Sequence, residues 1–416
     1  CFAESQLHSY ASRRVEIDQK HISLPPESFM EYIASCVTGK GAKTRTSRDV
    51  APNFYMADGS VGPDHLVHKD GVLLLGVGNP LLDISCKVPM DVLEKYGVKS
   101  GDIILAEDRH ATLYDELVAQ YAPEYIAGGA TQNSIRVCAW MLKAAGRAGG
   151  ACAFAGCVGA DANGAKLAEC ARAGGVEVAY QVDAEAPTGV CGVLVDPTNE
   201  RTLVTRLDAA NNFTKDHLET AAVQQLLVAS KVVYSAGFFL TSGGPDCTAL
   251  LGKHCADFGK RFCLNISAPF IAQFFGEALD ATMPFVDILF ANETEAAALG
   301  EARGWGSDVA TVALKCCDLP KASGRRARCV VFTQGADSTI VACEGAVTTY
   351  PVTPLAKELL VDTNGAGDAF VGGFLSRLVL GEGWDACVKA GHYAAREIIQ
   401  RPGCTVPDTC GYGSFF

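Results

Sequence analysis

From residue 71 onward, short apolar segments alternate with longer segments of helical periodicity. The predicted strands cover residues 72–78, 151–158, 232–236, 262–266, 286–290 and 329–332. The predicted helices cover residues 131–145, 163–173, 215–229, 246–259 and 294–299. Parallel strands need long crossover connections, which are usually helices. The alternation therefore predicts an α/β fold whose mostly parallel sheet is covered by helices on both faces.

Two predicted hairpins interrupt this alternation. The first joins residues 189–196 to 201–207 through the turn Pro197-Thr-Asn-Glu200, and the second joins 338–342 to 347–352. Short turns of this kind pair neighbouring strands in antiparallel fashion. We expect the first hairpin to be exposed and to contribute to a small lid over one edge of the sheet.

Residues 1–70 differ from the rest of the chain. They lack sustained periodicity and begin with Cys1 rather than methionine. This pattern predicts a flexible extension outside the fold, whereas residues 71–416 form the folded domain. The segment is neither strongly basic nor poor in acidic residues, which argues against a transit peptide.

The charge balance narrows the class of protein. Of 416 residues, 35 are basic and 47 are acidic, which gives a net charge of −12. A protein that binds nucleic acid without sequence preference needs a basic face, so nucleic acid is not an expected partner. No apolar run approaches the roughly 18 residues of a membrane-spanning helix, so no membrane partner is expected either. A monomer is the default expectation.

The 18 cysteines are scattered, and none of them forms a C-x-x-C pair. This spacing excludes a zinc knuckle and a thioredoxin-type motif. Many lie in apolar segments, where a free cysteine behaves as a small hydrophobic side chain. With no secretory signal in the sequence, the pattern predicts reduced thiols and a cytoplasmic location.

The most informative string is Asp362-Thr-Asn-Gly-Ala-Gly-Asp368, which leads into a predicted helix at 368–380. Gly365 and Gly367 permit backbone conformations that other residues resist, and they leave room for a ligand. A glycine turn that leads into a helix leaves unpaired N–H groups pointing outward, which is a ready anion site. The carboxylate of Asp368 is placed to face a hydroxyl group beside that anion. The alternative is that Asp368 only caps the helix.

Other strings accompany this one along the chain. They are Gly78-Asn-Pro-Leu-Leu-Asp83, Leu105-Ala-Glu-Asp108, Gly128-Gly-Ala-Thr-Gln-Asn-Ser134, Ala236-Gly-Phe-Phe-Leu240, Asn265-Ile-Ser-Ala-Pro-Phe270 and Asn292-Glu-Thr-Glu295. Together they resemble the ribokinase-like family of carbohydrate and nucleoside kinases, and within it the members that act on adenosine. The resemblance covers roughly residues 71–407.

This resemblance implies a fold and a reaction. The expected fold is a three-layer α/β/α core with a small discontinuous β-rich lid, drawn from parts of about residues 81–127 and 187–208. The expected reaction transfers the γ-phosphoryl group of ATP to the 5′-hydroxyl of adenosine, with Mg²⁺ as cofactor. Two alternatives remain: another nucleoside or sugar kinase of the same fold, or a catalytically inactive nucleoside-binding protein.

The resemblance also implies residue roles. The expected catalytic residues are Asp368 as base, the amides of Gly365, Ala366 and Gly367, and Arg201. The expected substrate-binding residues are Asn79, Leu81, Asp83, Leu105, Gly128, Gly129, Asn133, Cys191, Leu203, Leu207, Phe239, Phe270 and Asn364. The expected nucleotide-binding residues are Asn292, Thr333, Gly335, Thr363 and His392. Glu295 is expected to hold Mg²⁺ through water, because that ion keeps much of its hydration.

Several of these residues have a structural alternative. Asp83, expected to accept hydrogen bonds from the ribose hydroxyls, could instead cap a turn. Arg201 is expected to be exposed until it swings towards the phosphoryl group, or to remain a solvated surface arginine. Asn292 and Glu295 could form a capping box at a helix start. Asp368, with an ordinary pKa of about 3.9, is expected to take its proton late in the reaction.

Overall fold

The computed structural model describes residues 71–147 and 149–415, so the predicted extension at 1–70 lies outside the described residues. Within the described part, nine strands form one large sheet. Their order across the sheet is β14 (Ala346–Tyr350), β13 (Asp337–Cys343), β12 (Cys329–Gln334), β11 (Ile288–Asn292), β10 (Arg261–Asn265), β9 (Val232–Ala236), β1 (Leu74–Val77), β5 (Cys152–Gly159) and β6 (Val176–Asp183). Neighbours from β12 to β6 are parallel, which confirms the predicted sheet. The hairpin β13–β14 adds an antiparallel edge, also as predicted.

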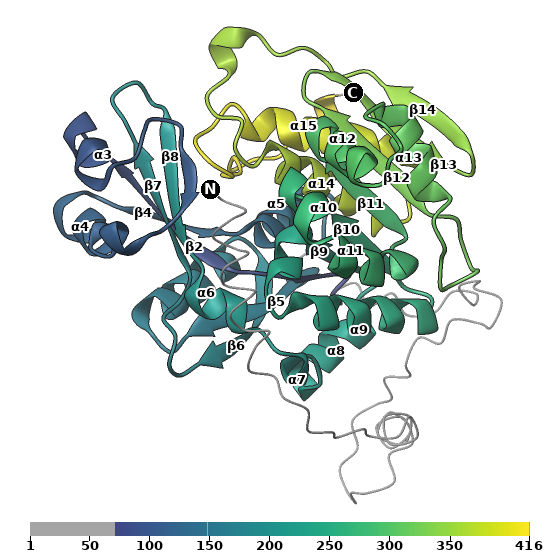
Figure 1. Ribbon diagram of the computed structural model, residues 1–416, viewed down its shortest axis with the longest axis horizontal. Coiled ribbons are helices and arrows are strands. Elements are labelled where there is room, and N and C mark those ends of the chain that lie inside the picture. The colour runs from purple at the N-terminus through teal and green to yellow at the C-terminus, as the bar shows by residue number, and fades with distance from the viewer. Residues whose placement is uncertain (1–70, 148, 416) are drawn as a thin grey trace, which may run out of the picture. The chain divides into compact units, whose positions relative to one another are not determined.

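Helices cover both faces of this sheet (Figure 1). One face packs against α5 (Ala130–Ala144), α14 (Ala366–Leu378) and α15 (Trp384–Ile398). The other packs against α8 (Ala221–Ala229), α9 (Gly244–Asp257), α10 (Pro269–Phe274), α11 (Gly276–Thr282), α12 (Glu293–Ala302) and α13 (Val309–Cys317). Successive strand side chains point to opposite faces, so Leu289 and Phe290 belong to different cores. This is the expected three-layer arrangement.

One predicted helix is divided in the structure. Residues 215–229 form α7 (Lys215–Leu218) and α8, because Thr220 has an extended backbone between them. The remaining helices are α6 (Ala162–Ala173) and α16 (Tyr412–Phe415), with 3₁₀ turns η1 (Asp108–His110), η2 (Asp208–Asn212), η3 (Gly237–Thr241), η4 (Met283–Phe285) and η5 (Lys357–Leu359). Among the described residues, none of these helices has the length and apolar character needed to cross a membrane.

A second, smaller sheet stands beside the large one. Its strand order is β3 (Ile103–Leu105), β8 (Arg201–Arg206), β7 (Val190–Val195), β2 (Leu81–Lys87) and β4 (Glu124–Gly128). The predicted hairpin is present as β7–β8, but the prediction that it is exposed is wrong, since every residue of β7 is buried. Helices α3 (Met90–Tyr96) and α4 (Leu113–Gln120) share a hydrophobic core with this sheet. Its role as a lid remains a prediction.

One pair of cysteines departs from the predicted reduced state. Cys329 and Cys343 form a disulfide between β12 and β13. The two residues are directly opposite in the antiparallel register, with their Cα atoms 4.6 Å apart, which is within bridging distance. The sequence could not indicate this pair, because strand register is not visible in cysteine spacing.

The parallel strands bring several predicted site residues to one edge. Asn79 follows β1 by two residues, Asn292 ends β11, and Thr333 is the penultimate residue of β12. In open α/β sheets, ligands bind outside the carboxyl ends of the strands. We therefore expect the ligand-binding site at the carboxyl edge of the large sheet.

Candidate active site

The signature loop leads directly into α14. Gly365 is the N-terminal cap residue, with a φ of 79° that favours glycine, and its position beside Cys404 leaves little space for a side chain. Within the described residues, no side chain accepts a hydrogen bond from the first turn at this cap position. A helix start without a side-chain cap keeps backbone N–H donors free for an anion.

Asp368 lies in the first turn of α14 and does not serve as its cap. Its Oδ2 accepts a hydrogen bond from Asn133 Nδ2 at 3.0 Å, which links α14 to α5. The alternative that Asp368 only caps the helix is therefore wrong. The carboxylate is held by Asn133, one of the residues expected to bind the sugar.

The environment of Asp368 changes its acidity. Burial raises the pKa of Asp368 to about 7; the hydrogen bond from Asn133 opposes this shift, while the charges of Glu295 and Asp83 add to it. The expectation of an ordinary pKa is therefore wrong, because sequence does not reveal desolvation. A base with a pKa near the operating pH is well matched to proton transfer.

Asp83 lies on β2, which pairs with β4; β4 ends at Gly128, and Gly129 caps the start of α5. A Cβ on Gly128 would stand 2.2 Å from Asp83 Oδ1, and one on Gly129 would stand 2.3 Å from the Asn79 carbonyl oxygen. The diglycine thus allows β4 and the Asp83 carboxylate to approach closely. Burial raises the pKa of Asp83 to about 7, against the opposing charges of Arg136 and Arg201.

Two asparagine side chains near these acids have unused acceptors. Asn79 donates from Nδ2 to the Ala210 carbonyl oxygen at 2.7 Å, and Asn133 donates to Asp368. The Oδ1 atoms of both side chains are buried and have no hydrogen-bond partner among the described residues. Buried polar atoms are normally satisfied, so these oxygens suit hydroxyl donors of a ligand.

The predicted apolar residues lie in different surroundings. Phe239 is fully buried and packs edge-on against Phe213, which makes it a core residue beneath the site. Phe270 is half-buried beside Phe238. Residues of the second sheet and its connections are Leu81, Leu105, Cys191, Leu203 and Leu207, of which only Cys191 is fully buried. Their contact with a base remains a prediction.

The prediction that Arg201 is exposed is wrong. It begins β8, is 8% exposed, and pairs with Asp362 at 3.4 Å, while its Nη2 donates to Ser85 Oγ at 3.3 Å. Asp362 also accepts hydrogen bonds from the backbone of Asn364 and Gly403. The partner of Arg201 lies 161 residues away in the chain, so the sequence could not reveal this ion pair. Its movement towards a phosphoryl group remains a prediction.

The capping-box alternative for Asn292 and Glu295 is confirmed. Asn292 Oδ1 accepts from the Glu295 amide at 2.8 Å, and Glu295 Oε2 accepts from the Asn292 amide at 3.0 Å. Burial raises the pKa of Glu295 to about 7. Asn292, Glu295, Thr333 and Gly367 also line one small cavity of about 40 Å³. The cap and a role beside the nucleotide are therefore compatible.

The other predicted nucleotide-binding residues lie close to this edge. His392 Nε2 is 2.8 Å from Thr339 Oγ1, and burial lowers the pKa of this histidine to about 4. Its ring lies against Phe370 of α14, with ring centres 5.6 Å apart. Gly335 and Thr363 are exposed on the turn after β12 and in the signature loop. A neutral histidine of this kind is suited to packing beside a flat ring.

Comparison with known proteins identifies the family. The pfkB family of carbohydrate kinases matches residues 90–410. The chain belongs to this family. It is 49% identical to adenosine kinase 1 of Arabidopsis thaliana over 340 residues, which cover 82% of this chain and 97% of the relative.

Solved structures of the pfkB family have the same fold as this chain. The Anopheles gambiae adenosine kinase in complex with P1,P4-di(adenosine-5) tetraphosphate is 44% identical, with a TM-score of 0.72 over 82% of this chain and 99% of that one. The Schistosoma mansoni adenosine kinase in complex with adenosine, in an occluded loop conformation, is 33% identical, with a TM-score of 0.74 over 82% of this chain and 99% of that one.

One residue near this pfkB-type site was not identified from the sequence. Arg136 lies three residues after Asn133 on α5, and its charge opposes the rise in the pKa of Asp83. Its Nη1 donates to the carbonyl oxygens of Ala127 and Cys404 at 2.9 and 3.2 Å. The guanidinium therefore joins the end of β4 to the segment near Gly365. The sequence could have indicated Arg136, because residues three apart on a helix, such as Asn133 and Arg136, lie on the same face.

Replacing Gly367 by alanine is expected to lower kinase activity without lowering the stability of the fold. In the structure, a Cβ on Gly367 would meet nothing within 4 Å, and alanine is the better helix former. We expect an unchanged or higher melting temperature, together with a fall in kinase activity of at least about tenfold, because the methyl group occupies the anion site. Thermal melting and a coupled kinase assay check the two halves. Full activity in Gly367→Ala would remove the first turn of α14 from the phosphate site.

Proposed function

We propose that this chain transfers the γ-phosphoryl group of ATP to the 5′-hydroxyl of adenosine, giving AMP and ADP. The observation that carries the proposal is the meeting of Asp368, Asn133 and the uncapped start of α14. The N-terminal end of α14 thus brings together a candidate base (Asp368), a side chain that can bind a hydroxyl group (Asn133) and a candidate anion site. The extensive identity to adenosine kinases supports adenosine as the acceptor.

The sugar would be held by Asp83, Asn79 and Asn133. Asp83 can accept hydrogen bonds from two vicinal hydroxyls, and the free Oδ1 atoms of Asn79 and Asn133 can accept others. Charge-assisted hydrogen bonds to a carboxylate are stronger than neutral ones. This grip would fix the ribose so that only the 5′-hydroxyl faces Asp368.

Asp368 would then accept the proton of that hydroxyl as it attacks. Phosphoryl transfer passes through a loose transition state, so positioning and charge stabilisation provide most of the catalysis. The amides of Gly365 and Gly367 would donate to the oxygens of the moving group. The Ala366 amide, which donates to the Thr363 carbonyl oxygen at 3.2 Å in the structure, would have to exchange that partner to join them. Arg201 would add a positive charge after leaving Asp362.

The residues present fit Mg²⁺ only as an ion that is bound mainly by ATP and water. Within the described residues, no cluster of three or more metal-ligating side chains exists. Glu295 is buried, and both of its carboxylate oxygens accept from Asn292, yet each keeps a further lone pair. Mg²⁺ commonly uses one or two carboxylates together with phosphates and waters. Bound with ATP, it would neutralise phosphate charge, and Glu295 would hold one of its waters.

A parallel assay with adenosine, inosine and ribose as acceptors tests the proposed function. We expect adenosine to be phosphorylated with a far higher kcat/KM than the other two. Preference for inosine or ribose would assign the chain to a different kinase of the family. Binding of adenosine without adenosine-dependent release of ADP would identify an inactive binding protein.

The pH dependence follows from Asp368. Burial raises the pKa of this carboxyl to about 7, and only its deprotonated form accepts a proton. We therefore expect kcat/KM for adenosine to rise with pH through the range around 7, where Asp83 also loses its proton, and to level off above it. Circular dichroism at each pH controls for unfolding. A flat profile between about pH 5.5 and 8 would contradict the assignment of Asp368 as base.

A further inference from the structure

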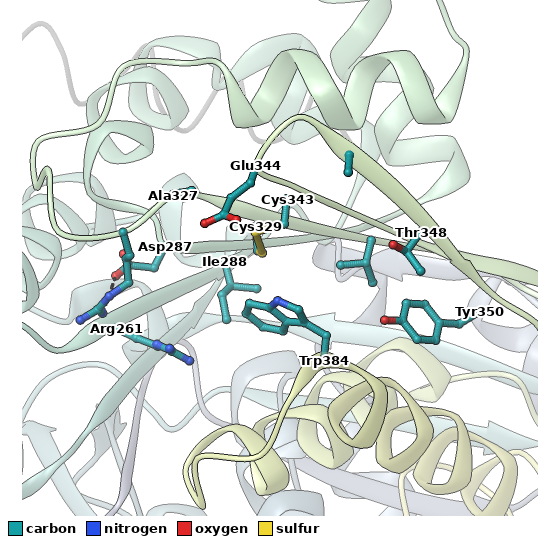
Figure 2. A pocket seen from close by; sticks show the side chains of 13 residues that line it. Arg261, Asp287, Ile288, Ala327, Cys329, Cys343, Glu344, Thr348, Tyr350 and Trp384 are labelled. Carbon is teal, nitrogen blue, oxygen red and sulfur yellow. Dashed lines mark ion pairs between the residues drawn. A yellow bond between two sulfur atoms is a disulfide. The ribbon is translucent and has the colours of Figure 1, made fainter. Parts of the chain in front are cut away.

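A second cavity, of about 340 Å³, lies at the other end of the parallel strands (Figure 2). Arg261, Ile288 and Cys329, the first residues of β10, β11 and β12, line it. The candidate active site uses the carboxyl ends of these same strands. The hairpin β13–β14 and Trp384 of α15 complete the wall. The cavity is therefore separate from the candidate active site.

The disulfide is part of this cavity wall. Cys329 and Cys343 both line the cavity; Cys329 is 1% exposed, whereas Cys343 is partly exposed. A small molecule in the cavity therefore meets the disulfide, and Cys343 is the more exposed of its two residues. Thiol–disulfide exchange requires such access to one sulfur.

Two opposite charges in the cavity are free. Arg261 is half-buried and Glu344 is exposed; neither side chain has an ion pair or side-chain hydrogen bond with the residues that the structure describes. Asp287, also in the wall, is already paired with Lys321 and Arg326. Figure 2 shows the Glu344 carboxylate beside Cys329, with Arg261 across the cavity. A ligand with both a carboxylate and an ammonium group would complement this pair.

We propose that this cavity is a modification site at Cys343 for a small zwitterionic thiol of the glutathione type. The ligand carboxylate binds Arg261, its ammonium group binds Glu344, and its thiol faces the disulfide. The size of the cavity lies within the range of small-ligand sites. This proposal does not depend on the kinase reaction.

The exchange is balanced without another reactant. The ligand thiolate forms a bond to the sulfur of Cys343, the bond between Cys343 and Cys329 breaks, and Cys329 leaves as a thiolate that takes up a proton. One disulfide is thus replaced by one mixed disulfide and one thiol. A second ligand thiol can release Cys343 by the same reaction and form the oxidised ligand.

The test compares two thiols on the full chain. Opening of the disulfide by glutathione and by neutral 2-mercaptoethanol is followed by alkylating freed thiols and mapping peptides that contain Cys329 and Cys343. Each rate is divided by the rate of the same thiol with free cystine, which removes intrinsic reactivity. We expect a preference of about fivefold for glutathione, which is the effect of one charge-assisted hydrogen bond in a partly exposed site.

Variants decide whether the cavity recognises the ligand. Arg261→Gln and Glu344→Gln should each reduce the preference towards unity. Arg325→Gln is the matched control, because this arginine is exposed and does not line the cavity. Glu344 is also exposed, so its variant keeps the test valid if Arg261→Gln melts early. Equal rates for the two thiols, an unchanged preference in both variants, or complete alkylation of both cysteines before any thiol is added would each overturn the proposal.

Discussion

Replacing Asp368 by asparagine is expected to slow adenosine phosphorylation by at least about 100-fold, while adenosine binds with nearly normal affinity. Asparagine keeps the shape of the side chain, and its amide oxygen can still accept the hydrogen bond from Asn133 Nδ2. It cannot take the proton of the attacking hydroxyl. Single-turnover kinetics together with calorimetric titration of adenosine separate these two effects.

The matched control for this experiment is Asp385→Asn. Asp385 lies in the first turn of the neighbouring helix α15 and is exposed. This variant should retain the activity of the parent chain. Turnover of Asp368→Asn within a few-fold of the parent would exclude Asp368 as the base.

Asp368→Asn is also expected to change the stability of the fold. The pKa of Asp368 is about 7 in the fold but has its ordinary value near 3.8 in the unfolded chain. The folded state therefore loses stability as pH rises from the lower value through the higher one. Asparagine removes this loss, so Asp368→Asn should melt at a higher temperature than the parent at pH values above about 7. A higher melting point with lower activity would distinguish a catalytic defect from misfolding.

The second large effect is expected from Gly128→Ala. The new Cβ would stand 2.2 and 2.4 Å from the carboxylate oxygens of Asp83, so the carboxylate must move away from its position. Loss of charge-assisted hydrogen bonds to the ribose should lower kcat/KM for adenosine by about 100-fold, mainly through KM. The KM for ATP should change little. Steady-state kinetics with each substrate varied in turn measure this difference.

Gly324→Ala provides the comparison for Gly128. A Cβ on Gly324 would meet nothing within 4 Å, and this glycine has no positive φ, so alanine is accommodated there without strain. Gly324→Ala should therefore keep the kinetics of the parent. If Gly128→Ala behaved in the same way, the close approach between β4 and Asp83 would have no bearing on sugar binding.

The main sheet was predictable because its strands carry strong local signals. Each central strand is a short, almost continuous apolar run, and β5, β9, β10 and β11 are each followed by a segment of helical periodicity. The signature at the start of α14 was also visible, since glycine spacing and an acidic residue are local features. The prediction that 215–229 is one helix was wrong, because Thr220 takes an extended conformation without a nearby glycine or proline.

Long-range pairings could not be predicted. The smaller sheet pairs β2 with β7 in parallel, although more than 100 residues separate Asp83 from its partner Cys191. The elevated pKa of Asp368 depends on burial and on Glu295 and Asp83, which only the fold brings near it. The burial of Arg201 and the disulfide at Cys329 have the same origin. Each depends on contacts between distant segments rather than on local pattern.

The buried ion pair between Arg201 and Asp362 favours the arrangement in which the smaller sheet and the loop before α14 stay in contact. It ties β8 of the smaller sheet to the loop that precedes α14, and the guanidinium is almost completely shielded from water. Any motion that separates these parts must leave two opposite charges briefly unmatched, which is costly in such surroundings. We therefore expect the smaller sheet to separate from this loop only infrequently.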